Sequence, residues 1–74
     1  MTQQEVSEIM DRNFDRLEEE FPDHTGIGVT KEDDEFVIRV AVPNLSDSRR
    51  AAATKEIEGV RIVILEEDLT GIAF

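Results

Sequence analysis

Two stretches of alternating apolar and polar residues, joined by an acidic run, constrain the fold more than any other feature of this sequence. Thr25 to Lys31 and Glu35 to Val42 both show the two-residue period of strands that bury one face. The run Glu32-Asp33-Asp34-Glu35 separates them and carries only acidic side chains. The pattern predicts a β-hairpin over residues 25–42.

The apolar positions also predict the register of this hairpin. A turn centred on Asp33-Asp34 places Val29 opposite Ile38 and Ile27 opposite Val40. A slip of one residue would turn the whole apolar set toward solvent, so this register is strongly favoured. Asp-Asp is not the preferred pair for a tight turn, so a two-residue turn and a four-residue loop both remain open.

The residues before the hairpin predict an amphipathic helix. Its apolar positions recur at spacings of three and four residues: Val6, Ile9, Met10, Phe14, Leu17 and Phe21. Thr2 and Glu5 have the spacing of a capping box at its start. Pro22 stops it, because the residue before a proline is displaced from the helical region.

After the hairpin, Pro43-Asn44 ends the strand and a shorter helix is expected from about Ser46 or Asp47 to Lys55 or Glu58. Ser46 is a suitable cap, and Gly59 is a suitable stop. Val60 to Leu65 then has branched apolar residues at successive positions, which is typical of a strand with neither face in solvent. Leu69 to Phe74 forms either a fourth edge strand or an extended tail.

The predicted order is therefore helix, hairpin, helix, strand (αββαβ). This is an α+β fold in which a three- to four-stranded sheet has its helices on one face. The chain of 74 residues is one domain, residues 1–74. A chain of this length buries only about 60% of its unfolded surface, so its stability is modest unless it associates.

If both helices cover the face with Ile38, the other face of the sheet is left uncovered and apolar. Such a face marks a partner site or a dimer interface. The alternative is that the C-terminal tail folds back over it, or that one helix crosses to it. The predicted interface consists of Gly26, Gly28, Val37, Ala41, Val63, Leu65 and, from the tail, Phe74.

The charge of the chain excludes several partners. It carries 18 acidic and 8 basic side chains, a formal net charge of −10. Nucleic-acid backbones and anionic membranes both need a basic surface, so neither is expected. The acidity fits a solvated surface, a salt-adapted proteome, or a surface that faces a basic partner or mimics nucleic acid. No signal peptide or membrane-spanning run is seen, and a cytoplasmic location is expected.

No combination of residues indicates catalysis, a cofactor or a metal. There is no cysteine, and His24 is the only histidine, so neither a cysteine nor a second histidine accompanies it, and none of Ser7, Ser46 and Ser48 has the surroundings of a nucleophile. We interpret His24 as a surface residue. Thr25-Gly26-Ile27-Gly28 lacks the following helix of a phosphate-binding loop, and the acidic runs lack the spacing of a calcium loop. The expected catalytic, cofactor and metal residues are none.

Residues 25–74 resemble a small bacterial α/β module with the pattern GVGxG…IxVxV…IxGVxV…GxIxA. The matching segments are Gly26-Ile27-Gly28-Val29, Phe36 to Val42, Ile57 to Ile64 and Leu69 to Phe74. Such modules occur alone or ahead of trypsin-like peptidase domains. Ala53 to Glu56 departs from the family, which often has a Leu-Pro step there. The resemblance implies no catalytic residue and suggests an accessory or propeptide-like role.

These observations favour a non-enzymatic module that binds a protein partner or a second copy through the uncovered sheet face. The second hypothesis is a peptidase-associated inhibitor in which the tail Gly71 to Phe74 lies in a substrate groove. An acidic mimic of nucleic acid is the third.

Overall fold

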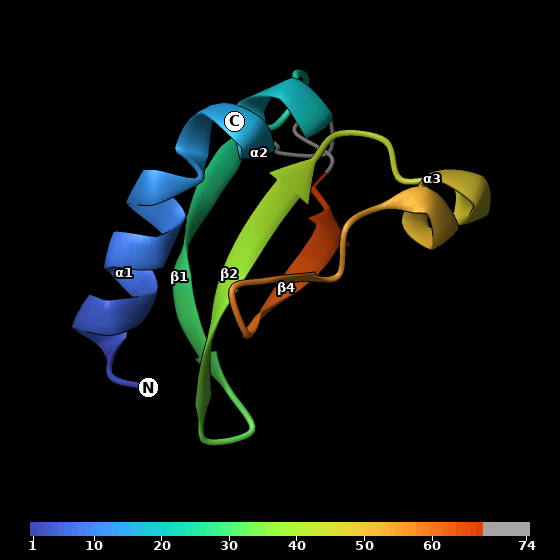
Figure 1. The fold of residues 1–74 in the computed structure, drawn as a ribbon. Helices are drawn as coiled ribbons and strands as arrows, with labels where there is room; N and C mark the ends of the chain where they lie inside the picture. The colour runs from blue at the N-terminus through green and yellow to red at the C-terminus, as the bar shows by residue number, and fades with distance from the viewer. Residues whose placement is uncertain (68–74) are drawn as a thin grey trace, which may run out of the picture.

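A four-stranded mixed sheet is the centre of the computed structural model, which describes residues 1–67. The strand order is β1-β2-β4-β3. The strands are β1 (Gly26–Glu32), β2 (Glu35–Val42), β3 (Glu56–Ile57) and β4 (Val60–Glu66). With three helices packed around this sheet, the predicted α+β class is confirmed (Figure 1).

The β1–β2 hairpin has the predicted register. Val29 pairs with Ile38 and Ile27 with Val40. The turn is the two-residue form, because Glu32 pairs directly with Glu35. Asp33 and Asp34 both have positive φ, at 52° and 63°. This left-handed pair matches the twist of the two strands, and aspartate tolerates it better than most residues.

The strand predicted at residues 60–65 is β4, and it lies inside the sheet. It pairs in parallel with β2, with Ile38 opposite Ile62. On its other side β3 pairs only through Glu56 and Ile57. β3 was not predicted: the helix expected to reach Lys55 or Glu58 ends at Ala52, and the chain extends into β3 instead. A second left-handed turn at Glu58-Gly59, with φ of 50° and 82°, leads back into β4.

The single helix expected over the first 21 residues is two helices, α1 (Gln3–Arg12) and α2 (Phe14–Glu20). The break is at Asn13, whose side-chain amide donates hydrogen bonds to the Ile9 carbonyl at 2.8 Å and to the Glu58 carboxylate at 2.6 Å. Arg12 donates to the same carboxylate at 2.7 Å. These bonds hold the pKa of Glu58 below its ordinary value, chiefly through Arg12.

Both α1 and α2 lie over one face of the sheet (Figure 1). The capping box predicted at Thr2 and Glu5 is present. The apolar side of these helices packs against the strands and forms one core. The buried members are Val6, Ile9, Leu17, Phe21, Ile38, Val40, Val42, Ile57, Val60 and Ile62.

α3 (Asp47–Ala52) does not cover the sheet as expected. It buries no residue and lies to one side, beyond β4 (Figure 1). The predicted cap is present, because the Ser46 hydroxyl accepts a hydrogen bond from the Arg49 amide. The alanines of this helix offer too little apolar surface to anchor it on the core. Its position therefore depends on polar contacts and on Leu45 and Ala53, which flank it and pack against the core.

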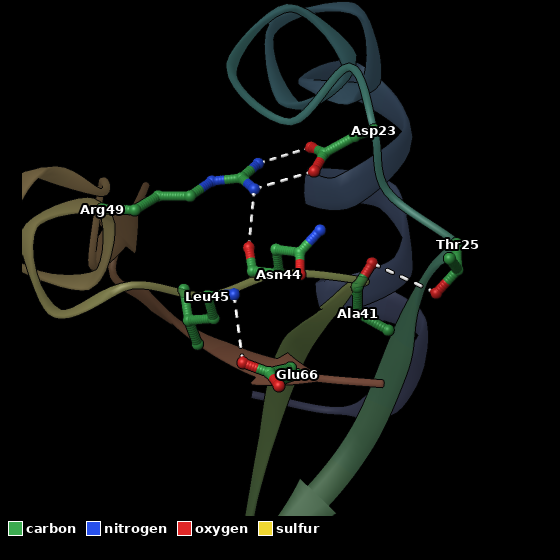
Figure 2. Close-up of polar contacts among 7 residues, drawn as sticks. All are labelled: Asp23, Thr25, Ala41, Asn44, Leu45, Arg49 and Glu66. Carbon is green, nitrogen blue, oxygen red and sulfur yellow. Dashed lines mark hydrogen bonds and ion pairs between the residues drawn. The ribbon is translucent and has the colours of Figure 1, made fainter. Parts of the chain in front are cut away.

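Those polar contacts join α3 to the end of α2. The Arg49 guanidinium donates to both carboxylate oxygens of Asp23 and, at 3.0 Å, to the Asn44 carbonyl (Figure 2). It also lies 5.8 Å from the centre of the Phe21 ring. Arg49 holds the pKa of Asp23 below its ordinary value. Nearby, the Thr54 amide donates to the Glu20 carboxylate at 2.8 Å.

Candidate interaction surface

The face of the sheet opposite α1 and α2 is covered by no helix within residues 1–67. Register places its members: alternate residues of β1, β2 and β4 point to this side. We call it the helix-free face. It contains Gly26, Gly28, Thr30, Glu35, Val37, Arg39, Ala41, Arg61, Val63 and Leu65.

The predicted interface residues on this face differ in exposure. Val37 is fully buried and Ala41 is 2% exposed, so the expectation that these two form an uncovered apolar surface is wrong. Val63 and Leu65 are half-buried, Gly28 is half-buried and Gly26 is exposed. Phe74 lies outside the described residues. The accessible part of the predicted interface is therefore Gly26, Gly28, Val63 and Leu65.

Two arginines form ion pairs on this face. Arg61 on β4 lies 3.4 Å from the Glu32 carboxylate of β1 and 3.5 Å from that of Glu35 on β2. The pairing of Ile38 with Ile62 places Arg61 level with Val37, on the same side of the sheet. Arg39 lies 3.9 Å from Glu67. Sequence reasoning missed these ion pairs, although the alternation already placed Arg39 and Arg61 on the same side as Val37.

An open hollow of about 270 Å³ remains at one end of the face. It is lined by Gly26, Ile27, Gly28, Arg39, Ala41 and Glu67. A Cβ atom built on Gly26 or Gly28 would meet no other atom within 4 Å. Neither glycine has a positive φ, so the backbone does not require glycine there. The absence of side chains creates space that the described part of the chain leaves unfilled.

The remaining candidate groups show no catalytic arrangement. His24, expected to be a surface residue, is half-buried: its side chain is 24% exposed, and Nδ1 is enclosed without a hydrogen-bond partner among the described residues. Its Nε2 lies 3.9 Å from the Glu18 carboxylate. Within residues 1–67 no three histidine, cysteine or acidic side chains converge as a metal site requires. No helix in that range is long and apolar enough to cross a membrane.

Comparisons with protein-family models, with curated proteins and with solved structures found no match. The resemblance of residues 25–74 to a bacterial peptidase-associated module therefore stays a prediction. The tail from Gly71 to Phe74, on which the inhibitor hypothesis depends, lies outside the described residues. Of the surfaces considered in the sequence, the helix-free face is the one whose residues the structure describes.

Proposed function

We propose that the chain is a non-enzymatic protein-interaction module that associates through the helix-free face, with a second copy of itself as the partner. The observation that carries the proposal is the hollow above Gly26 and Gly28, which residues 1–67 leave unfilled. Glycine inside a strand weakens the strand, because it has no side chain to pack and loses more backbone entropy on folding. Two such positions that no side chain of the described range fills favour a role in receiving a partner's side chains.

The face also supplies side chains of the kind that such a hollow accepts. Val63 and Leu65 are apolar and half-buried on the same face. A surface with both a hollow and apolar side chains is self-complementary, as an interface around a two-fold axis requires. Arg39 and Glu67 border the hollow with opposite charges, so each copy can also pair its arginine with the other copy's carboxylate.

The net charge of −10 opposes self-association. The strength of this repulsion depends on the distance over which the charges act. At about 0.15 M salt the Debye length is about 8 Å, so charges on the distant sides of two copies are largely screened. Apolar contact on the face is not screened. Association through this face should therefore strengthen as the salt concentration rises.

The variant Gly28→Val separates interaction from folding. Valine fills the hollow and favours a strand, so we expect the monomer's free energy of unfolding to rise by about 0.5–1 kcal/mol. Self-association measured by sedimentation equilibrium should be lost. Leu65→Glu should also abolish it, whereas Gln4→Glu, which adds the same charge on α1, should not. A wild-type chain that stays monomeric at high concentration and high salt would refute the dimer.

A further inference from the structure

The outer edge of β4 is covered only in part by β3 within residues 1–67, and the edge borders the helix-free face at Arg61 and Val63. The Ile62 amide donates to the Lys55 carbonyl at 2.9 Å, next to Glu56, the first residue of β3. Alternate residues of a strand direct their backbone groups to the same side, so those of Ile64 and Glu66 also point outward. The Glu67 amide, with the opposite parity, bonds to Val42 of β2. Within residues 1–67 the outward groups of Ile64 have no backbone partner.

A groove of about 270 Å³ lies along this edge. Its lining residues are Arg50, Lys55, Arg61, Ile62, Val63 and Ile64. The apolar members come from β4, whereas Arg50 comes from α3 and Lys55 from the segment before β3. The groove thus combines branched side chains, free strand backbone and cationic side chains from a helix that lies off the sheet.

The groove is lined by basic side chains, although the chain as a whole is acidic. No acidic residue lines it, although acidic side chains outnumber basic ones by 18 to 8. Arg50 and Lys55 are exposed and form no ion pair within the described residues. By contrast Arg12, Arg39 and Arg49 each hold a carboxylate. The two unpaired cations beside a free strand edge are complementary to an acidic extended segment.

We propose that this groove binds an extended acidic segment of a partner protein, which adds to β4 as a strand where β3 stops. Strand addition supplies main-chain hydrogen bonds at a free edge, and alternate side chains supply specificity. One set of the partner's side chains would contact Val63, on the side of β4 opposite Ile62 and Ile64. The other set, carrying carboxylates, would reach Arg50 and Lys55. A second copy bound edge to edge would instead bring the same cations together, and like charges disfavour that pairing.

The net negative charge of the chain does not prevent this binding. Repulsion from acidic residues beyond about 8 Å is largely screened at physiological ionic strength. A direct pair with Arg50 or Lys55 acts at contact distance and is screened less. Binding at the edge should therefore weaken as salt rises, whereas association through the helix-free face should strengthen.

The test uses a labelled synthetic peptide of about eight residues, alternating glutamate and valine, and follows its fluorescence anisotropy with the full chain. Reversal of both cations, Arg50→Glu with Lys55→Glu, should weaken binding by about tenfold or more. The matched control, Arg16→Glu with Lys31→Glu, makes the same charge change at two other exposed cations. It should leave affinity within about twofold.

Two further peptides test the mode of binding. A lysine–valine peptide should fail to bind, and a glutamate–valine peptide N-methylated at alternate residues should bind at least about tenfold more weakly. Equal loss in the groove and control variants would show a general charge effect and overturn the proposal, as would unaffected binding of the methylated peptide. Gly28→Val should leave peptide affinity unchanged, so failure of one surface does not imply failure of the other.

Discussion

α1 and α3 are held to the same molecule by different forces. α1 buries Val6 and Ile9 against the sheet, whereas α3 buries nothing. Instead, the Arg49 guanidinium of α3 donates to the Asp23 carboxylate. The segment after α3 is held by the Thr54 amide, which donates to the Glu20 carboxylate. Apolar burial is insensitive to salt and pH, while exposed ion pairs are worth little and are screened. We therefore expect α1 to unfold together with the core and α3 to loosen separately.

This difference matters for the proposed groove. Arg50 belongs to α3, and the other lining residues belong to the sheet or to the segment before β3. Conditions that release α3 should open the groove without unfolding the core. Three measurements test whether α1 and α3 differ in this way.

The largest effect is expected for Leu17→Ala in α2, next to α1. Leu17 is 1% exposed, and its truncation should lower the free energy of unfolding by about 2–5 kcal/mol, measured by urea denaturation. Arg50→Ala, on exposed α3, should change it by no more than about 0.5 kcal/mol. Similar losses for the two variants would show that α3 belongs to the cooperative core.

A smaller and local effect is expected for Asp23→Asn. The two carboxylate bonds to Arg49 are weakened, and global stability should fall by no more than about 1 kcal/mol. Hydrogen exchange should accelerate at Arg50 and Ala53, whose amides bond within α3, and not at Val6. Asp15→Asn removes an equivalent charge from α2 and serves as the control. Faster exchange across α1 as well would contradict separate attachment.

The smallest effect is expected on acidification of the wild-type chain. Arg49 lowers the pKa of Asp23 below its ordinary value of 3.8. A lowered folded-state pKa means that the stabilisation is present above the unfolded value and is lost as pH falls through the folded value. Chemical shifts of α3 should therefore change below pH 3.8 together with the Asp23 carboxyl signal, before those of α1. Simultaneous change in both helices would count against the distinction.

α1 also has an acid-sensitive contact, so acidification weakens a polar contact at both α1 and α3. Glu58 also has a lowered pKa, because Arg12 and Asn13 donate to it. Acid should weaken that contact over a similar range. α1 should nevertheless stay in place, because its buried side chains remain packed on the sheet.

Local pattern was sufficient for the elements whose signals lie close together in the chain. The β1–β2 register followed from two alternating stretches across one turn, and the caps at Thr2 and Ser46 followed from hydroxyls that precede helical residues. The break at Asn13 was not predictable in this way. It involves Glu58, which lies 45 residues away along the chain.

The candidate surface was predicted only in part for the same reason. Alternation correctly placed Gly26, Gly28, Val63 and Leu65 on the face without helices. It did not reveal that Arg61 of β4 pairs with Glu32 of β1, or that Val37 is buried. A contact between a long side chain and another strand can be predicted only when the strand order is known. Strand order depends on distant segments and is not a local property.

The sequence by itself determined the hairpin and its register, the apolar stripe of the first helical segment and the double-sided strand β4. These depend on periodicity and turn chemistry, which act between near neighbours. Only the tertiary structure decided the parallel pairing of β4 with β2, the short β3 that pairs with only part of β4, and the position of α3 beside the sheet. Those features depend on contacts between distant segments, where burial and a few polar pairs outweigh local preference.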